Sequence, residues 1–157
     1  MRMTLSEIQA EVKNRIFDNQ GLIIGEPIVM QEAWFYEQTA YHLLVGAYFT
    51  TKFNFVVSVI NKTRNNGSLH FIPGSFDVSQ VRNTVCEMVF DQFDETSFRQ
   101  KRRIIMDCGK LIIRLIKQID AIELGQEQAE EIDFKIKFDH CEMLTDVDWI
   151  EEKMREM

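Results

Sequence analysis

The segment from Phe98 to Ile119 constrains the fold most, because its cationic and apolar residues fall on opposite sides of one helix. At about 100° per residue, one broad arc is apolar and contains Phe98, Ile105, Cys108, Ile112, Leu115, Ile116 and Ile119. The other side carries a basic stripe, namely Arg99, Arg103, Lys110, Arg114 and Lys117, flanked by Arg102. We therefore expect a long amphipathic helix that packs on a core. Thr96 or Ser97 can cap its start, and Gly109 is expected to weaken it by about 1 kcal/mol.

The charge of this segment is opposite to that of the chain as a whole. The chain has 157 residues, with 18 Lys and Arg against 25 Asp and Glu. Residues 95–119 hold seven basic and two acidic residues, whereas residues 120–157 hold four basic and thirteen acidic ones. Two interpretations follow: the charges serve contact with a partner, or the acidic C-terminal region lies across the basic helix of its own chain.

The remaining pattern predicts a single α+β domain over residues 1–157. We expect an N-terminal helix, an antiparallel or mixed sheet of about four to five strands, two consecutive long helices, one further strand and a short C-terminal helix. A capping box from Thr4 to Glu7 predicts the first helix, with a buried side formed by Leu5, Ile8, Val12 and Ile16. The expected strands are Leu22–Ile24, Ile28–Trp34, Tyr41–Phe49, Phe53–Lys62 and Leu69–Ile72.

Two features of the strand region need a structure to resolve them. Asn66-Gly67 is typical of a two-residue hairpin turn, which requires positive φ at both positions. The sequence does not decide whether residues 31–62 form strands or helices, since 33–45 and part of 53–60 also fit helical spacing.

Further elements are predicted in the second half of the chain. Residues 78–93 predict a helix that opens at an Asp77 cap, and residues 132–138 alternate as an edge strand would. A cap over Thr145–Asp148 predicts a terminal helix whose inward side holds Val147, Ile150 and Met154.

Three cysteines without a CxxC pair predict reduced thiols, and Cys86 and Cys108 fall in apolar helical patterns. With no secretory signal and no apolar run of about 18 residues, we expect a cytoplasmic protein that does not enter a membrane. No phosphate-binding glycine loop and no G-x-S-x-G motif are present, and adjacent His140 and Cys141 would point to opposite faces of a strand. No cofactor and no metal are therefore expected.

Arg64-Asn65 followed by His70 resembles the R-N-x(n)-H signature of HEPN-type ribonucleases. The resemblance covers residues 64–70 and implies a metal-independent ribonuclease in which histidine and arginine act at the scissile phosphate. That family is all-helical and its motif opens a helix, whereas here the motif lies between two expected strands.

The preferred interpretation is a non-enzymatic binding protein that acts by protein–protein contact, as inhibitors, immunity proteins, phage modulators and chaperones do. The acidic segment from Glu127 to Glu156 would face a basic partner, with Met143 and Trp149 as apolar anchors. Nucleic-acid binding through the basic helix 98–119 is the alternative, and a ribonuclease using Arg64 and His70 is a third.

Overall fold

Four antiparallel strands form the sheet of this protein in a computed structural model, which describes residues 2–12, 14, 22–23, 26–27, 29–49, 53–73, 78–120 and 141–157. The strands lie in the order β3-β4-β5-β6. Their bounds are β3 (Val29–Glu37), β4 (Tyr41–Phe49), β5 (Phe53–Asn61) and β6 (Asn66–Pro73). A separate two-residue pair joins β1 (Leu22–Ile23) to β2 (Glu26–Pro27).

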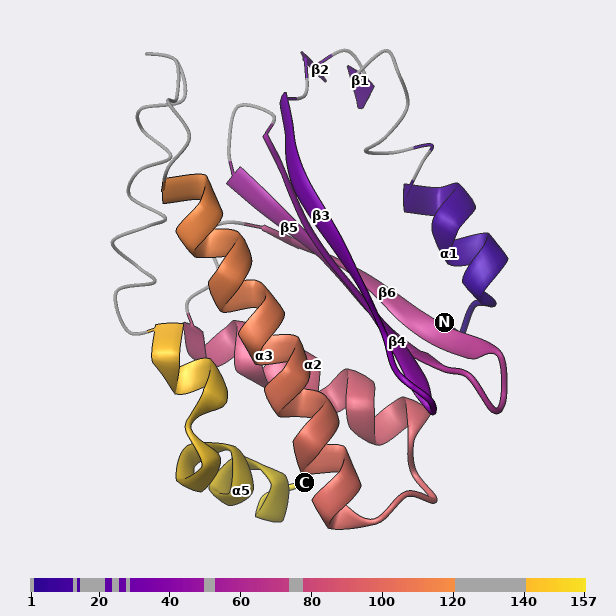
Figure 1. The fold of residues 1–157 in the computed structure, drawn as a ribbon, viewed down its shortest axis with the longest axis vertical. Coiled ribbons are helices and arrows are strands. Elements are labelled where there is room, and N and C mark those ends of the chain that lie inside the picture. Colours follow the sequence, from indigo (N-terminus) through magenta and orange to yellow (C-terminus); the bar gives the residue numbers. More distant parts are fainter. Residues whose placement is uncertain are drawn as a thin grey trace.

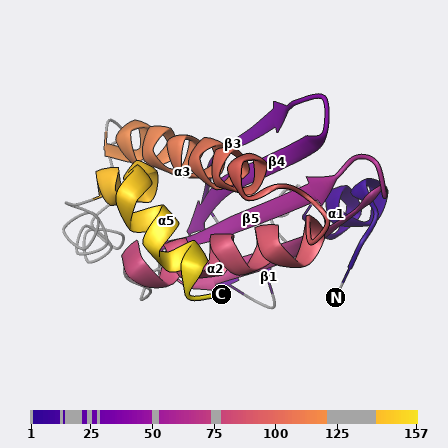
Figure 2. The same ribbon diagram turned by 90° about the horizontal axis from the view of Figure 1, so that it is seen from below.

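The helices lie on both faces of this sheet (Figures 1 and 2). One face is covered by α2 (Val78–Gln92) and α3 (Phe98–Asp120). A short 3-10 helix, η3 (Cys141–Thr145), and the helix that follows it, α5 (Val147–Arg155), pack against these two helices. The short helix α1 (Leu5–Val12) lies on the other face. The predicted α+β fold class is thus confirmed.

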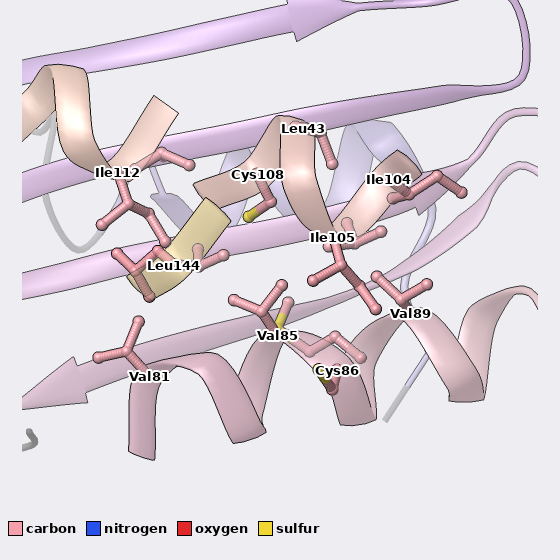
Figure 3. Close-up of a cluster of buried hydrophobic side chains, with 14 of the residues drawn as sticks. Leu43, Val81, Val85, Cys86, Val89, Ile104, Ile105, Cys108, Ile112 and Leu144 are labelled. Atoms are coloured by element: carbon pink, nitrogen blue, oxygen red, sulfur yellow. The ribbon is translucent and has the colours of Figure 1, made fainter. Parts of the chain in front are cut away.

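The main core lies between the sheet and α2, α3 and η3 (Figure 3). Alternation along β4 and β5 supplies the sheet side of this core, because successive side chains of a strand point to opposite faces. These residues are Tyr41, Leu43, Val45, Phe55, Val57 and Val59. Of the predicted seam of α3, Ile105, Cys108, Ile112 and Leu115 are buried in this core, together with Ile104 and Leu111, which the prediction did not include. The side chains of Ile116 and Ile119 lie outside the described residues. Cys86 and Cys108 are free thiols within this core, as the pattern predicted.

A smaller cluster packs α1 against the opposite face of the sheet through Ile8, Val12, Leu44, Val56 and Ile60. The predicted capping box forms: Glu7 donates its N–H to the Thr4 hydroxyl (3.2 Å), and Thr4 donates its N–H to the Glu7 carboxylate (3.4 Å). The predicted Ile16 lies outside the described residues. The described part of the helix is therefore fixed at its start by the cap and along its length by Ile8 and Val12.

The ambiguity over residues 31–62 is resolved as strand, since its described residues form β3, β4 and β5 apart from the 38–40 turn and Lys62, with which the next turn begins. The predicted turn at Asn66-Gly67 is wrong. The chain reverses over residues 62–65, where Asn65 takes the positive φ of 49° and the Asn61 side chain accepts the N–H of Thr63 at 3.0 Å. Gly67 instead lies within β6.

Glycine is required at position 67 for a reason other than a turn, namely the close approach of neighbouring main chain. Its main chain exchanges two hydrogen bonds with Met3, at 2.7 and 2.6 Å. A Cβ at this position would lie 2.5 Å from the Val59 carbonyl oxygen, so a larger residue would collide with β5.

Two further predictions fail at helix ends. Phe98 is 42% exposed, because the buried seam of α3 begins only at Ile104. Val147 is 38% exposed, since Leu144 takes the buried place at that end of α5, where Asp146 is the N-cap. The predicted strand 132–138 and the Asp77 cap lie outside the described residues. Within the described part of the chain, no helix is both long and apolar enough to cross a bilayer.

Candidate functional site

A groove runs between the N-terminal half of α3 and the 38–40 turn that joins β3 to β4. Its cavity measures about 690 Å³. The α3 side contributes Ser97, Arg99, Gln100, Arg102, Arg103, Met106, Asp107 and Lys110, and the sheet side contributes Gln38, Thr39, Ala40 and Tyr41. We call this cavity the basic groove. It unites four of the predicted basic residues with a turn that no sequence pattern linked to them.

The cations of the groove are presented by a regular, capped helix. The Ser97 hydroxyl accepts the N–H of Gln100 at 3.2 Å, which confirms one of the two predicted caps. Arg99, Arg103 and Lys110 are exposed. The side chains of these three residues make no ion pair or hydrogen bond with the part of the chain that the structure describes. Their charge is therefore not neutralised by any of the described residues.

Arg102 differs from these three because it pairs with Glu151 of α5. Both side chains are partly buried, and Glu151 also pairs with Arg155 one helical turn later at 3.5 Å. The acidic C-terminal region thus does reach the basic helix, where Glu151 neutralises the flanking Arg102 by an ion pair.

The floor of the groove contains a carboxylate. Tyr41, which is buried at the start of β4, donates its hydroxyl hydrogen bond to Asp107 of α3. The Tyr41 ring meets Phe93 edge to face, with centroids 6.4 Å apart. Burial of the ring, followed by the bond to Asp107, raises the pKa of Tyr41. The phenol therefore remains a donor at physiological pH, and it holds Asp107 between Arg103 and Lys110 on the helix.

The opposite wall is braced by the neighbouring turn. Lys62 donates its Nζ to the Gln38 carbonyl oxygen at 3.0 Å, and its N–H donates to the Ala40 carbonyl oxygen at 3.0 Å. The same ammonium pairs with Glu37 at 3.1 Å. The groove is consequently formed in advance of any ligand by contacts among β3, β4 and the 62–65 turn.

The other predicted binding residues lie outside this groove. Arg114 is exposed further along α3, and the side chain of Lys117 lies outside the described residues. Met143 is 39% exposed on η3. Trp149 is half-buried, and its ring is covered by the guanidinium carbon of Arg82 at 3.5 Å. The proposed anchors Met143 and Trp149 therefore do not join the cations in one site.

Arg82 is a feature that the sequence pattern did not reveal. It is only 6% exposed, and neither Nε nor Nη1 has a hydrogen-bond partner. Burial lowers the pKa of its guanidinium. The sequence did not predict that Arg82 is buried. It directly follows Val81 in an apolar helix, and long cationic side chains usually carry their charge to solvent.

The residues of the ribonuclease resemblance are not brought together. Arg64 lies in the 62–65 turn and pairs with Asp94 at 3.0 Å and Glu95 at 3.3 Å. His70 lies opposite Val57, four residues into β6, which places it about 13 Å along the strand from the turn. Among the described residues, no group of three or more His, Cys, Asp or Glu side chains is placed to hold a metal ion.

Comparison with known proteins gives one match. The model of a family described as being of unknown function (DUF5834) matches residues 4–156 of this chain. Neither the curated proteins nor the solved structures contain a significant match. The functional argument therefore depends on the residues of the chain itself.

Proposed function

Because the chain belongs to this family of unknown function, we propose its role from the basic groove: it is a non-catalytic binding protein that acts by protein–protein contact, and the groove is its interface. The matching surface of the partner is acidic. This places the protein among those that act by covering a site on another macromolecule, as inhibitors, immunity proteins and chaperones do.

The observation that carries this proposal is the exposed charge of Arg99, Arg103 and Lys110. Their side chains line one cavity and form no ion pair or hydrogen bond with the described residues. Arginine can bind a carboxylate through two parallel hydrogen bonds, which adds geometric selectivity to attraction. On a chain of net charge −7, a local basic surface also orients an approaching partner, because the rest of the surface repels the same acidic group.

The described part of the acidic C-terminal segment is a weaker candidate for the interface. Glu151 is paired with Arg102 and Arg155, and Trp149 is stacked on Arg82. These contacts hold α5 against α2 and α3, so using them for a partner would first require breaking them.

Nucleic-acid binding is the second candidate, and the row formed by Arg99, Arg103 and Lys110 favours it. From the first to the last of these residues, the helix rises by about 16 Å, enough to follow several phosphates. Against it, Asp107 lies within the row, and Tyr41, the aromatic residue of the groove, has its ring packed on Phe93 rather than open for base stacking.

A charge-matched pair of variants tests the proposal. Arg99→Glu with Arg103→Glu reverses two groove cations, and Arg2→Glu with Arg155→Glu makes the same change in net charge at exposed positions elsewhere. The full chain and both variants are used to capture partners from the source cell, and bound protein and nucleic acid are both quantified. We expect a stoichiometric acidic protein that the wild type and the control retain and the groove variant loses.

Association of the purified pair should slow as salt rises, since screening weakens electrostatic steering. Two results would overturn the proposal: the groove variant captures the same partner as well as the control does, or groove-dependent capture yields nucleic acid and no protein.

A further inference from the structure

We infer that the basic groove binds an extended acidic peptide segment of its partner, with carboxylates spaced two residues apart. This inference rests on the proposed function and makes it specific, because it names a linear segment rather than a folded acidic surface.

The lining of the groove combines cationic side chains with a carboxylate, and this combination suits a polypeptide. Arg99, Arg103 and Lys110 offer positive charge, whereas Asp107 offers a hydrogen-bond acceptor between them. Tyr41 donates to one oxygen of the Asp107 carboxylate, and an ionised carboxylate has about four acceptor sites, so it can accept from a second donor. A ligand for this groove must therefore bring both anions and a donor.

An acidic peptide supplies both kinds of group. Its side chains carry carboxylates, and each residue other than proline carries a main-chain N–H. A nucleic-acid strand carries a negative charge at every phosphodiester linkage, and its donors are base edges and, in RNA, 2′-hydroxyl groups rather than a main-chain N–H at each residue, so repulsion by Asp107 is less readily offset. The lining accordingly favours a peptide over a single nucleic-acid strand.

The spacing of the arginines suggests the register. Arg99 and Arg103 are separated by one helical turn, a rise of about 6 Å. In an extended chain, residues i and i+2 point to the same side and lie about 6.7 Å apart. Two acidic side chains in the pattern acid-x-acid can thus meet the two guanidinium groups, while the N–H of a following residue approaches Asp107.

The cavity size agrees with a short segment. Its volume of about 690 Å³ lies within the range of about 300–1,000 Å³ that is usual for ligand pockets. The braced 38–40 turn, held by Lys62, forms a wall that need not reorganise on binding.

Fluorescence anisotropy with defined probes tests this inference on the full chain. The probes are the labelled peptides (Glu-Ser)6, (Gln-Ser)6 and (Lys-Ser)6 and a twelve-nucleotide oligouridylate. We expect binding of (Glu-Ser)6 alone among the peptides, more tightly than the oligouridylate. Arg99→Glu with Arg103→Glu should weaken it at least tenfold, and Arg2→Glu with Arg155→Glu should change it less than threefold.

The variant Asp107→Asn distinguishes binding of the acidic peptide from binding of the oligouridylate. Removing the negative charge relieves repulsion for both, but it also takes from the peptide the charge-assisted acceptor that we assign to its main-chain N–H. We expect the oligouridylate to gain affinity by a larger factor than (Glu-Ser)6. Circular dichroism of every variant checks that the fold is kept, and Arg99→Gln with Arg103→Gln replaces the glutamate variant if it is not.

The outcomes distinguish this inference from the proposed function. Tighter binding of the oligouridylate, or equal binding of (Glu-Ser)6 by the groove variant and its control, overturns the peptide inference. If no peptide binds but a whole protein is still captured in a groove-dependent way, the linear segment is wrong and the proposed function stands. If groove-dependent capture also fails, both are wrong.

Discussion

Gly109 of α3 lies directly against the main chain of Leu144 in η3. A Cβ at position 109 would lie 3.0 Å from the Leu144 carbonyl carbon and closer still to its oxygen. The residue that was expected to weaken the helix therefore allows the main chain of the C-terminal region to approach α3 closely, and Leu144 enters the core there.

We expect Gly109→Ala to destabilise the protein even though alanine is the better helix former. The propensity gain of about 1 kcal/mol is outweighed by the collision with rigid main chain, and we expect a net loss of about 2 kcal/mol. Urea unfolding measures it, with Lys110→Ala as the control at an exposed neighbouring position. A rise in stability for Gly109→Ala would show that η3 does not pack here.

Arg82→Met should leave the protein as stable as the wild type or raise its free energy of unfolding by about 1 kcal/mol. The guanidinium is buried with two unpartnered nitrogens, and an apolar side chain of similar length removes that desolvation cost. Arg82→Lys, which keeps the charge but loses the planar stacking on Trp149, should be destabilised. A marked loss of stability in Arg82→Met would mean that the Trp149 contact outweighs the burial of the charge.

Glu151 pairs with two arginines in different surroundings, so double-mutant cycles can compare them. With Arg102, which is partly buried and 49 residues away in sequence, we expect a coupling free energy of about 1 kcal/mol. With Arg155, which is exposed on the same helix, we expect about 0.3 kcal/mol. Alanine substitutions and thermal unfolding at low and high salt provide the values, and equal couplings would contradict the asymmetry.

Stability should fall at alkaline pH because of two thiols in the core. Burial raises the pKa of Cys86 from 9.0 to about 11 and that of Cys108 from 9.0 to about 12. The folded protein thus keeps protons that the unfolded chain loses above pH 9, and each thiol lowers the free energy of unfolding by about 1.4 kcal/mol per pH unit up to its folded pKa.

Urea unfolding between pH 8 and pH 10.5, with a reductant present, measures this slope. Cys86→Ala leaves one buried thiol and should flatten the dependence, whatever it does to stability at pH 8. A profile of unchanged slope in that variant would show that the Cys86 thiol does not contribute to the pH dependence.

The local pattern predicted most of the fold and half of the site. The basic stripe and the seam of α3 follow from a 3.6-residue period, and the β4 and β5 strands follow from alternation and β-branched residues. The opposite wall of the groove could not be predicted, because Tyr41 meets Asp107 across 66 residues and only the packing of α3 on the sheet brings them together. Arg82 was hidden for the same reason, since its stacking partner Trp149 comes from a distant helix.

The turn at 62–65 shows where a short motif misleads. Asn-Gly carries a strong local preference, yet the register in which Asn61 pairs with Asn66 moves the reversal toward the N-terminus. Tertiary pairing with Met3 then gives Gly67 a role that its own dipeptide does not reveal.

The Met3–Gly67 bridge also bears on how molecules of this protein meet one another. An outer strand such as β6 offers main-chain donors and acceptors to which the sheet of a second molecule can be added, the usual route to polymerisation. Two of these groups are already taken by the N-terminal residues of the same chain. Those residues therefore block part of the exposed edge of the sheet. A recombinant form in which Met3 cannot make these hydrogen bonds should self-associate more readily.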